Sequence, residues 1–522
     1  MLYEPCASRR ANYMKPGNRL EHKQRRSAFA VKLRKGKRTD ASVKQRLMRM
    51  QIPNGPETRP ALSLKVNSQE LVDREPRLGT ALDATSQARL FKELLERDET
   101  EGVKEAVIRE IHRSMLETHS PPTDVYLAAN LPKSIAEYCV PTHALAGSAL
   151  SILCNISVDS PEGEQSAADS GVLPKLLPFF TPPLTSSLQP AALLLGNLVL
   201  SSTSIKLLPD IQAIRDLALA CIRRNEVRDL SQASGLAHFL GSYLDSDQPS
   251  ELIRHISEAL ATLLSVPDPT HQLLCMVLTR LDGWEEGTVY DSLDRSLVLE
   301  LVRTLGYNWP LELQLALSIL QKVLKEESSQ EFILSCGTLD RLPKLLVFPN
   351  TEVRVSTYDL LQMMVTTAKA TIAPVLSHPV LIEAIAGISD PEESINECAV
   401  DLVTALSDLR QLQICERLLE LDLLTELGKL NLETNSILSQ VPFTQRFLET
   451  VQNLIATRGT PEDQSLKESL CRSGCYDLIL TCSCSDNSHV SLLAQDILCD
   501  YFSEEDNAES MPQPSVANFQ FS

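Results

Sequence analysis

Apolar, helix-like segments recur along this chain at a spacing of about 42 residues. The clearest pair is GSALSILCNISVD (147–159) and QPAALLLGNLVLS (189–201), whose asparagines Asn155 and Asn197 lie 42 residues apart. Further steps of similar length fall in apolar segments with markers at Tyr243 or Ser242, Arg280, Gln321, Gln362, Thr404 and Asn453, and a last segment covers 490–502. A sustained period of this length indicates a repeat architecture.

Strand-like alternation is almost absent, and Pro, Gly, Asp or Ser interrupts the apolar pattern at short intervals, so short helices are expected. An all-helical repeat of about 42 residues is typical of armadillo and HEAT repeats, which have two or three helices each. One such repeat cannot bury its own apolar face, so neighbouring repeats must stack. We therefore predict an all-α, right-handed superhelical solenoid of about nine to ten armadillo repeats, with an extended concave surface suited to binding partners.

Short segments precede several of the marker helices and share one pattern. SGVLPKLLPFF (170–180) and SCGTLDRLPKLLVF (335–348) both place Gly before a Pro-containing apolar stretch, and NLPKSIAEYC (130–139) has Pro at a similar place. Gly favours a helix end or turn, and Pro is tolerated in the first helical turn. The pattern predicts a turn followed by a new short helix.

Charge divides the chain into parts. Residues 1–50 hold 15 Lys and Arg against 3 Asp and Glu, whereas the rest holds 34 against 65, a net charge of +12 beside −31. Such an asymmetry indicates a basic segment with its own partner. We assign 1–50 to a basic segment, helical or disordered, 51–85 to a flexible linker rich in Pro and Gly, 86–503 to the repeat array, and 504–522 to an acidic, disordered tail.

Cysteine use and the absence of membrane signals place the chain inside the cell. Many of the 13 cysteines fall within apolar helical patterns, no signal peptide precedes them, and no run of 18 apolar residues occurs. We expect reduced thiols and no membrane insertion.

Cys471, Cys475, Cys482, Cys484 and His489 form a cluster, but their spacings are not those of structural zinc sites. Without a phosphate-binding loop, a dinucleotide fingerprint or a hydrolase motif, we expect no enzyme, no metal and no cofactor.

The basic segment carries a specific spacing of residues. Arg9 and Tyr13 are followed by Gly17, an arginine pair stands at Arg25 and Arg26, and LRKGKR covers 33–38. This pattern resembles the importin-β-binding segment of the importin α family, and the repeat array resembles that family's body. The resemblance assigns receptor binding to the following residues: Arg9, Tyr13, Arg25, Arg26, Leu33, Arg34, Lys35, Lys37 and Arg38.

The resemblance also implies a mechanism and a set of partners. Lys44-Gln45-Arg46 stands where the family has a basic cluster that occupies its own groove in an autoinhibited form, so Lys44 and Arg46 are candidate autoinhibitory residues. Implied partners are an importin-β-like receptor, cargo proteins with basic signals, and a nuclear export receptor at the last repeat. The implied location is the cytoplasm and the nucleus.

In the family, W-x-x-x-N on one helix of each repeat reads an extended basic peptide. An Asn amide can bond both N–H and C=O of a peptide backbone, and residues four apart share a helix face. Applied to this chain, the resemblance assigns the cargo groove to Asn155, Asn197, Phe239, Gln321, Tyr358 and Gln362. The alternative for each amide is a bond to a neighbouring carbonyl, and for Phe239 and Tyr358 it is a place in the core.

The chain departs from the family in its tryptophans, because Trp284 and Trp309 both lie off the marker positions. An armadillo-repeat scaffold that no longer binds ordinary nuclear-localisation signals is therefore the alternative function. The family of transmembrane and coiled-coil domain-containing protein 6 is similar in pairing a basic segment with degenerate repeats. Nucleic-acid binding by the basic segment is a third hypothesis, disfavoured because a body of net charge −31 repels phosphate.

Overall fold

The computed structural model describes residues 69–79, 82–117, 123–227, 229–244, 248–265, 271–282, 292–367, 369–430, 441–458 and 464–502. Within these ranges every regular element is a helix and no strand occurs, which confirms the all-α prediction. The predicted basic segment 1–50 and acidic tail 504–522 lie outside the described residues. The chain divides into two compact units: unit 1 ends at Phe239 and unit 2 begins at Leu240.

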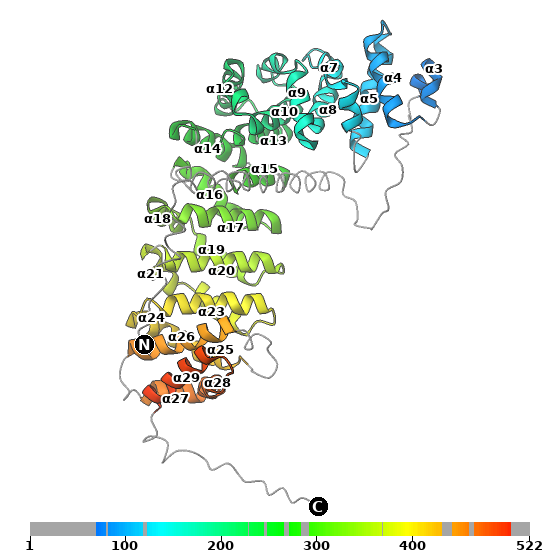
Figure 1. Ribbon diagram of the computed structural model, residues 1–522. Helices are drawn as coiled ribbons and strands as arrows, with labels where there is room; N and C mark the ends of the chain where they lie inside the picture. Colours follow the sequence, from blue (N-terminus) through cyan, green and yellow to red (C-terminus); the bar gives the residue numbers. More distant parts are fainter. Residues whose placement is uncertain are drawn as a thin grey trace, which may run out of the picture. The chain divides into compact units, whose positions relative to one another are not determined.

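The helices follow one another closely along the chain (Figure 1). From unit 1 up to the helix that crosses into unit 2 they are α3 (Gln69–Arg74), η1 (Pro76–Gly79), α4 (Ala84–Glu96), α5 (Glu101–Glu117), α6 (Thr123–Ala128), α7 (Leu131–Ala136), α8 (Ala146–Asp159), α9 (Pro161–Asp169), η2 (Leu173–Lys175), η3 (Leu177–Phe180), α10 (Leu188–Ser201), α11 (Thr203–Lys206), α12 (Pro209–Arg223) and α13 (Leu230–Gly241). In unit 2 they are α14 (Ser250–Leu264), α15 (His271–Asp282), α16 (Arg295–Thr304), α17 (Pro310–Leu324), α18 (Glu327–Ser335), α19 (Thr338–Leu346), α20 (Thr351–Thr366), α21 (Lys369–Ser377), α22 (Val380–Ala386), η5 (Gly387–Ser389), α23 (Glu393–Ser407), α24 (Leu412–Glu420), α25 (Leu423–Gly428), α26 (Val441–Arg458), α27 (Gln464–Ser473), α28 (Cys475–Ser483) and α29 (Ser488–Tyr501).

In each repeat one helix carries the apolar segment with the marker residue, and we call it the marker helix; in most repeats it is the longest helix. The marker helices are α5, α8, α10, α13, α15, α17, α20, α23, α26 and α29. Asn155, Asn197, Arg280, Gln321, Gln362, Thr404 and Asn453 all lie in marker helices, as the 42-residue period predicts. Tyr243 is the exception, because α13 ends at Gly241.

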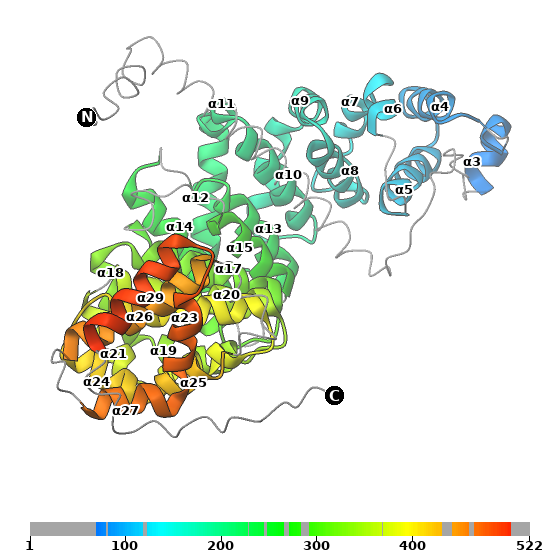
Figure 2. The same cartoon turned by 60° about the horizontal axis from the view of Figure 1, so that its bottom comes forward.

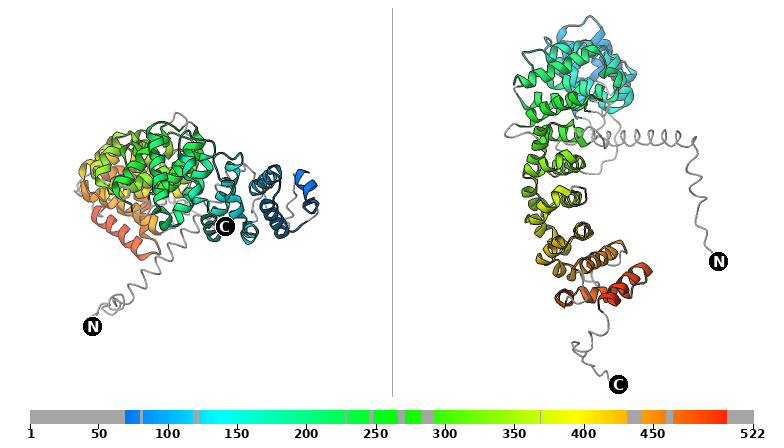
Figure 3. Two further views of the ribbon diagram at one scale, coloured as in Figure 1. Left: turned by 90° about the horizontal axis from the view of Figure 1, so that it is seen from above. Right: turned by 90° about the vertical axis from the view of Figure 1, so that its left-hand side faces the viewer.

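Neighbouring marker helices contact one another in chain order. In unit 1, α5 contacts α8 and α8 contacts α10. In unit 2, α15, α17, α20, α23, α26 and α29 form a continuous series of contacts, which Figure 1 and the right view of Figure 3 show as a stack. In Figure 2 the same helices overlap, with α29 in front. The shorter helices stack in the same way, with α19 on α22, α22 on α25 and α25 on α28. Each repeat therefore buries its apolar face against its neighbours, as a solenoid requires.

A left-handed backbone residue precedes the second helix of several repeats. Gly171, Gly337 and Gly474 have φ values of 84°, 76° and 87°, and Asn130 and Asp422 have φ of 54° and 57° at the equivalent point. Gly reaches this region without steric cost, and Asn and Asp are the side chains that tolerate it best. The predicted turn is confirmed at Asn130, Gly171 and Gly337, and the structure adds the equivalent turns at Asp422 and Gly474.

The predicted linker 51–85 is wrong at its C-terminal end. Residues 69–79 form α3 and η1, whose Leu71 and Leu78 are 0% and 4% exposed, and α3 contacts α5. Pro, Gly and charge dominate the composition here, but the two leucines bury enough apolar surface to dock this segment. Ordered structure begins at Gln69, and residues 51–68 lie outside the described ranges.

Gly428 allows α25 to approach α27 closely. A Cβ on Gly428 would lie 1.7 Å from the carbonyl oxygen of Ser473, and a backbone atom cannot rotate away as a side-chain end can. We expect Gly428→Ala to lower the free energy of unfolding of unit 2 by about 3 kcal/mol. Gly147→Ala is the control, because its Cβ would meet Ser187 Oγ at 3.4 Å. Hydrogen exchange of the α25 and α27 amides checks Gly428→Ala, and that of the α8 and α10 amides checks the control. Unchanged exchange in Gly428→Ala would contradict the prediction.

Candidate functional site

Each marker helix of unit 2 leaves one strip of side chains uncovered, which we call the ladder face. Its residues recur three or four apart and are half-buried or exposed, because the flanks of the helix pack against neighbouring repeats. Over the three central marker helices the ladder face consists of Leu311, Gln314, Leu315, Ser318, Gln321, Lys322, Val355, Ser356, Asp359, Gln362, Met363, Ser394, Glu397, Cys398, Asp401 and Ala405. In unit 1 the corresponding half-buried positions include Ser151, Asn155 and Asn197.

Two of the predicted groove amides have open polar groups. Asn155 on α8 and Gln362 on α20 are half-buried, and no side-chain hydrogen bond joins either to a residue that the structure describes. A primary amide offers two N–H donors and a carbonyl acceptor. Both side chains can therefore bond the N–H and C=O groups of an extended peptide without breaking an existing contact.

The other two predicted amides are engaged within the protein. Gln321 Nε2 donates to the carbonyl oxygen of Ser356 on the next marker helix at 3.1 Å. Asn197 Nδ2 donates to Ser157 Oγ at 3.1 Å, and Asn197 Oδ1 accepts from His238 Nε2 at 2.9 Å. Both amides form hydrogen bonds between successive repeats. An amide bonded within the protein is the alternative to groove binding that the sequence left open.

Phe239 and Tyr358 do not line a groove, so their assignment as groove residues is wrong. Phe239 is 0% exposed and its ring lies 5.6 Å from that of Phe180. Tyr358 is 1% exposed, and its hydroxyl donates to the carbonyl oxygen of Ala384 at 3.0 Å. At these two markers the position four residues earlier points into the core, so neither ring offers a surface to a lysine stem.

Carboxylates gather on the ladder face of α20 and α23. Partial burial raises the pKa of Asp359 and of Asp401, and the neighbouring Arg446 opposes the shift at Asp401. Arg446 Nη1 lies 2.6 Å from Asp401 Oδ1, so this carboxylate already has a cation. Burial, followed by the charges of Asp359, Asp401 and Glu397, raises the pKa of Cys398 to about 12. A thiol held in its neutral form is a poor nucleophile.

A second carboxylate is paired in the same manner. Lys322 Nζ donates to Asp282 Oδ1 at 3.0 Å and Ser318 Oγ donates to the same oxygen at 2.6 Å. Asp359 and Glu397 have no such partner among the described residues. The unpaired carboxylates of the ladder face, which a ligand could bind, therefore lie on α20 and α23.

Sequence reasoning missed these acidic residues, although the signal was present. Asp359 and Asp401 are separated by 42 residues, which is the repeat period itself. A search for charged residues at the same register would have found them. His238 also follows Asn197 by nearly one period, but its role needs the packing of α13 against α10.

The predicted receptor-binding and autoinhibitory residues cannot be placed. Arg9, Tyr13, Arg25, Arg26, Leu33, Arg34, Lys35, Lys37 and Arg38 all lie outside the described residues, as do Lys44 and Arg46. Their assignment stays a prediction from the sequence.

The cysteine cluster of the last repeat shows no metal-site arrangement. Cys475 and Cys482 are buried in α28, and burial raises the pKa of both to about 11. Across the part of the chain that the structure describes, no group of three or more His, Cys, Asp or Glu residues is placed to hold a metal ion.

No single helix within the described ranges has the length and hydrophobicity to cross a membrane. One sharply bent pair, Thr371–Ser377 with Val380–Ser389, meets those two criteria together.

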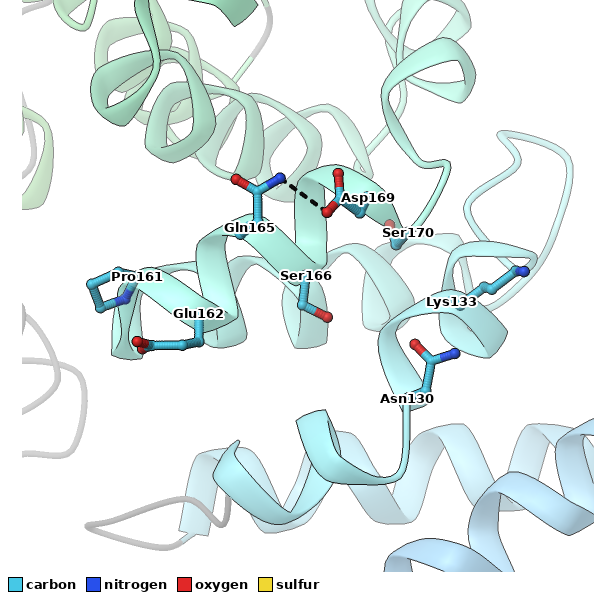
Figure 4. A pocket seen from close by; sticks show the side chains of 8 residues that line it. All are labelled: Asn130, Lys133, Pro161, Glu162, Gln165, Ser166, Asp169 and Ser170. Carbon is cyan, nitrogen blue, oxygen red and sulfur yellow. Dashed lines mark hydrogen bonds between the residues drawn. The ribbon is translucent and has the colours of Figure 1, made fainter.

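Unit 1 contains a cavity of about 540 Å³ lined by residues in and next to α7 and α9 (Figure 4). Asn130 and Lys133 line one side, and a row of polar side chains from α9 lines the other. Gln165 Nε2 bonds Asp169 Oδ2 at 2.9 Å within that row. The lining carries both signs of charge, from Lys133 on one side and from Glu162 and Asp169 on the other.

Comparison with known proteins supports the fold. No protein-family model matches the sequence, and no curated protein matches it. Among solved structures, the crystal structure of an engineered protein matches with a TM-score of 0.57 at 16% identity, over 81% of this chain and 100% of the other. A designed armadillo repeat protein matches with a TM-score of 0.38 at 17% identity, over 46% of this chain and 98% of its own.

The fold is an armadillo-type, all-α solenoid. The stacking of marker helices and of shorter helices, together with the period of about 42 residues, indicates this architecture. The engineered protein with a TM-score of 0.57 shares the overall arrangement of helices. At 16% identity the likeness shows the fold and nothing about activity. Solenoids of this kind generally bind partners along the stacked face instead of catalysing reactions.

Proposed function

We propose that the chain is an importin-α-like adaptor for protein import into the nucleus. In this proposal the basic segment 1–50 binds an importin-β-like receptor, and the ladder face takes cargo proteins with basic signals. The observation that carries the proposal is the spacing of Leu33, Arg34, Lys35, Lys37 and Arg38 in front of an acidic armadillo-type array. A segment of this charge repels itself when isolated and would fold on an acidic partner surface.

The open groups on the ladder face support a cargo role. In unit 2, Gln362 offers an uncommitted amide and Asp359 and Glu397 offer uncommitted carboxylates; in unit 1, Asn155 offers an uncommitted amide. An extended basic peptide needs both, amides for its backbone and carboxylates for its side chains. Export receptor binding at the last repeat and shuttling between cytoplasm and nucleus belong to the same proposal.

A second function is favoured by a different observation. Phe239 and Tyr358 are buried, and Trp309 lies at the N-terminal end of α17 instead of on the ladder. Without aromatic slots, lysine stems lose a cation–π contribution of about 0.5–2 kcal/mol each. The alternative is therefore an armadillo-type interaction scaffold that has kept the fold and no longer binds ordinary nuclear-localisation signals.

A pull-down separates the two functions. We expect the full-length chain to capture importin β, and a chain lacking residues 1–50 to lose at least tenfold in binding, since several charge-assisted bonds of about 1.5–3 kcal/mol each are removed. Replacing Lys35, Lys37 and Arg38 by Ala should cause most of that loss. The matched control replaces Lys44 and Arg46, which should leave receptor binding within twofold and increase binding of a basic signal peptide.

The outcome is decisive in either direction. If the full-length chain captures no importin β, the adaptor proposal fails at its main support. If it captures importin β but neither it nor the Lys44/Arg46 variant binds a basic signal peptide, the scaffold alternative holds for the ladder face.

A further inference from the structure

Three successive marker helices of unit 1 are joined by one chain of polar groups. Ser157 Oγ on α8 donates to the carbonyl oxygen of Cys154 at 2.8 Å. Asn197 Nδ2 on α10 donates to Ser157 Oγ at 3.1 Å, and His238 Nε2 on α13 lies 2.9 Å from Asn197 Oδ1. Ser157 is 5% exposed and His238 is 4% exposed, so both ends of this hydrogen-bond chain are buried, whereas Asn197 between them is half-buried.

The donor and acceptor roles in this chain follow from its chemistry. A hydroxyl has one proton, and that of Ser157 goes to the Cys154 carbonyl, so Ser157 Oγ must accept from the Asn197 amide nitrogen. The Asn197 carbonyl oxygen therefore faces His238. An amide oxygen can only accept, so His238 must carry its proton on Nε2.

Gly196 makes the approach of His238 possible. A Cβ at Gly196 would lie 2.3 Å from His238 Cδ2 and 2.9 Å from its Nε2. A Gly inside a helix costs about 0.5–1 kcal/mol relative to Ala. Gly196 therefore lowers the stability of α10 slightly but allows the imidazole to lie against the helix backbone beside Asn197.

We propose that His238 and Ser157 act as built-in ligands of Asn197 and close this position of unit 1 to a bound peptide. A bound peptide would donate a backbone N–H to the Asn197 carbonyl oxygen and would accept a bond from the Asn197 amide nitrogen at a backbone C=O. In the structure, His238 Nε2 is the donor to that oxygen and Ser157 Oγ is the acceptor from that nitrogen. Asn155, one repeat earlier at the same register, keeps its amide open. This inference rests on the proposed peptide-binding function and specifies which unit 1 position serves it.

The closed position has a consequence for selectivity. A segment bound along unit 1 would have its backbone held at Asn155 and not at Asn197. Removing the imidazole would free the Asn197 carbonyl oxygen and open a second position beside the first. His238 is therefore a specificity-determining residue of the ladder face, acting through Asn197.

The first test measures the tie itself and needs no ligand. Asn197→Ala, His238→Ala and the double variant are compared in the full chain by hydrogen exchange of the α10 and α13 amides. We expect each single variant to raise the opening equilibrium constant, and the two effects to be non-additive by about three- to tenfold, as for one buried hydrogen bond. His238→Gln, which keeps a donor, should restore part of the protection. Additive effects would overturn the proposal.

The second test uses a fluorescein-labelled peptide with the sequence of residues 29–49 of this chain. In the full-length protein, we expect Asn197→Ala to change its affinity by less than twofold and the matched control Asn155→Ala to weaken it by about three- to tenfold. His238→Ala should tighten binding by a similar factor, and adding Asn197→Ala should remove that gain. Weaker binding by Asn197→Ala alone would overturn the proposal.

The two failures are distinguishable. If no variant binds the peptide, the cargo part of the proposed function fails, and the exchange experiment still decides whether Asn197 is tied to His238. If the peptide binds and Asn197→Ala and His238→Ala show no coupling in exchange, the built-in ligand is excluded and the peptide-binding function stands.

Discussion

Phe239→Ala is expected to lower the free energy of unfolding of unit 1 by about 3–5 kcal/mol, the usual cost of deleting a fully buried phenyl ring. The ring is 0% exposed and lies against Phe180, so its removal leaves a cavity and loses the aromatic contact. Hydrogen exchange of α13 is the measurement, because unfolding of a repeat array need not be two-state and a local readout avoids that assumption.

The same variant discriminates between a core ring and a groove ring. A side chain that lined an exposed slot would change stability by no more than about 0.5 kcal/mol when truncated and would weaken peptide binding directly. Phe332→Ala is the matched control, since this ring is half-buried beside Arg295 and should cost less. Equal exchange in wild type and Phe239→Ala would contradict the buried placement.

His271→Ala is expected to destabilise unit 2 by about 2–3 kcal/mol at neutral pH, because it leaves a buried carboxylate without its partner. Glu312 on α17 is 0% exposed and is in ion-pair contact with His271 Nδ1 on α15. The figure is below the usual cost of breaking a buried pair, since the His271 side chain is 43% exposed and water partly screens the contact.

The pair should also give unit 2 a pH dependence with a defined sign. Burial raises the pKa of Glu312, although His271 opposes the shift. The folded state therefore holds this proton more tightly than the unfolded state. The resulting stabilisation is complete below the ordinary Glu pKa of about 4.3 and is lost as the pH rises through the raised value.

Glu312→Gln isolates this effect, because the amide stays neutral across the range. We expect the variant to gain stability relative to wild type as the pH rises from about 4 to 8, by about 1.4 kcal/mol for each unit by which the pKa is raised. Urea unfolding in a Trp284→Phe background follows it through Trp309, whose ring lies 5.7 Å from that of His271. Parallel stability profiles for variant and wild type would contradict the assignment.

Much of the fold follows from local patterns in the sequence. The apolar period places Asn155, Gln321 and Gln362 in marker helices, and Gly337 marks the turn before the second helix of its repeat. Helical periodicity and turn chemistry depend on neighbours a few residues away, so one sequence is enough to recover them. The linker boundary was wrong because the docking of Leu71 and Leu78 depends on a helix outside that segment.

The candidate site was only partly predictable. The amides of Asn155 and Asn197 look alike in sequence, yet one is open and the other is bonded to Ser157 and His238. The difference lies in the imidazole of His238 from the next repeat, which reaches Asn197 because its neighbour Gly196 has no side chain to block it. Contacts between residues about 40 positions apart depend on how helices pack, which the period does not specify.

By itself, the sequence determined that this chain is an all-α repeat array with a basic segment in front, because period and charge are properties of the chain before it folds. The tertiary structure decided which side chains remain available on that array. Phe239 and Tyr358 lie in the core because the stacked repeats cover these positions, and removing their apolar surface from water stabilises the fold. Asn197 is bonded to Ser157 and His238 because helix packing brings both side chains within hydrogen-bond distance and Gly196 leaves room for the imidazole.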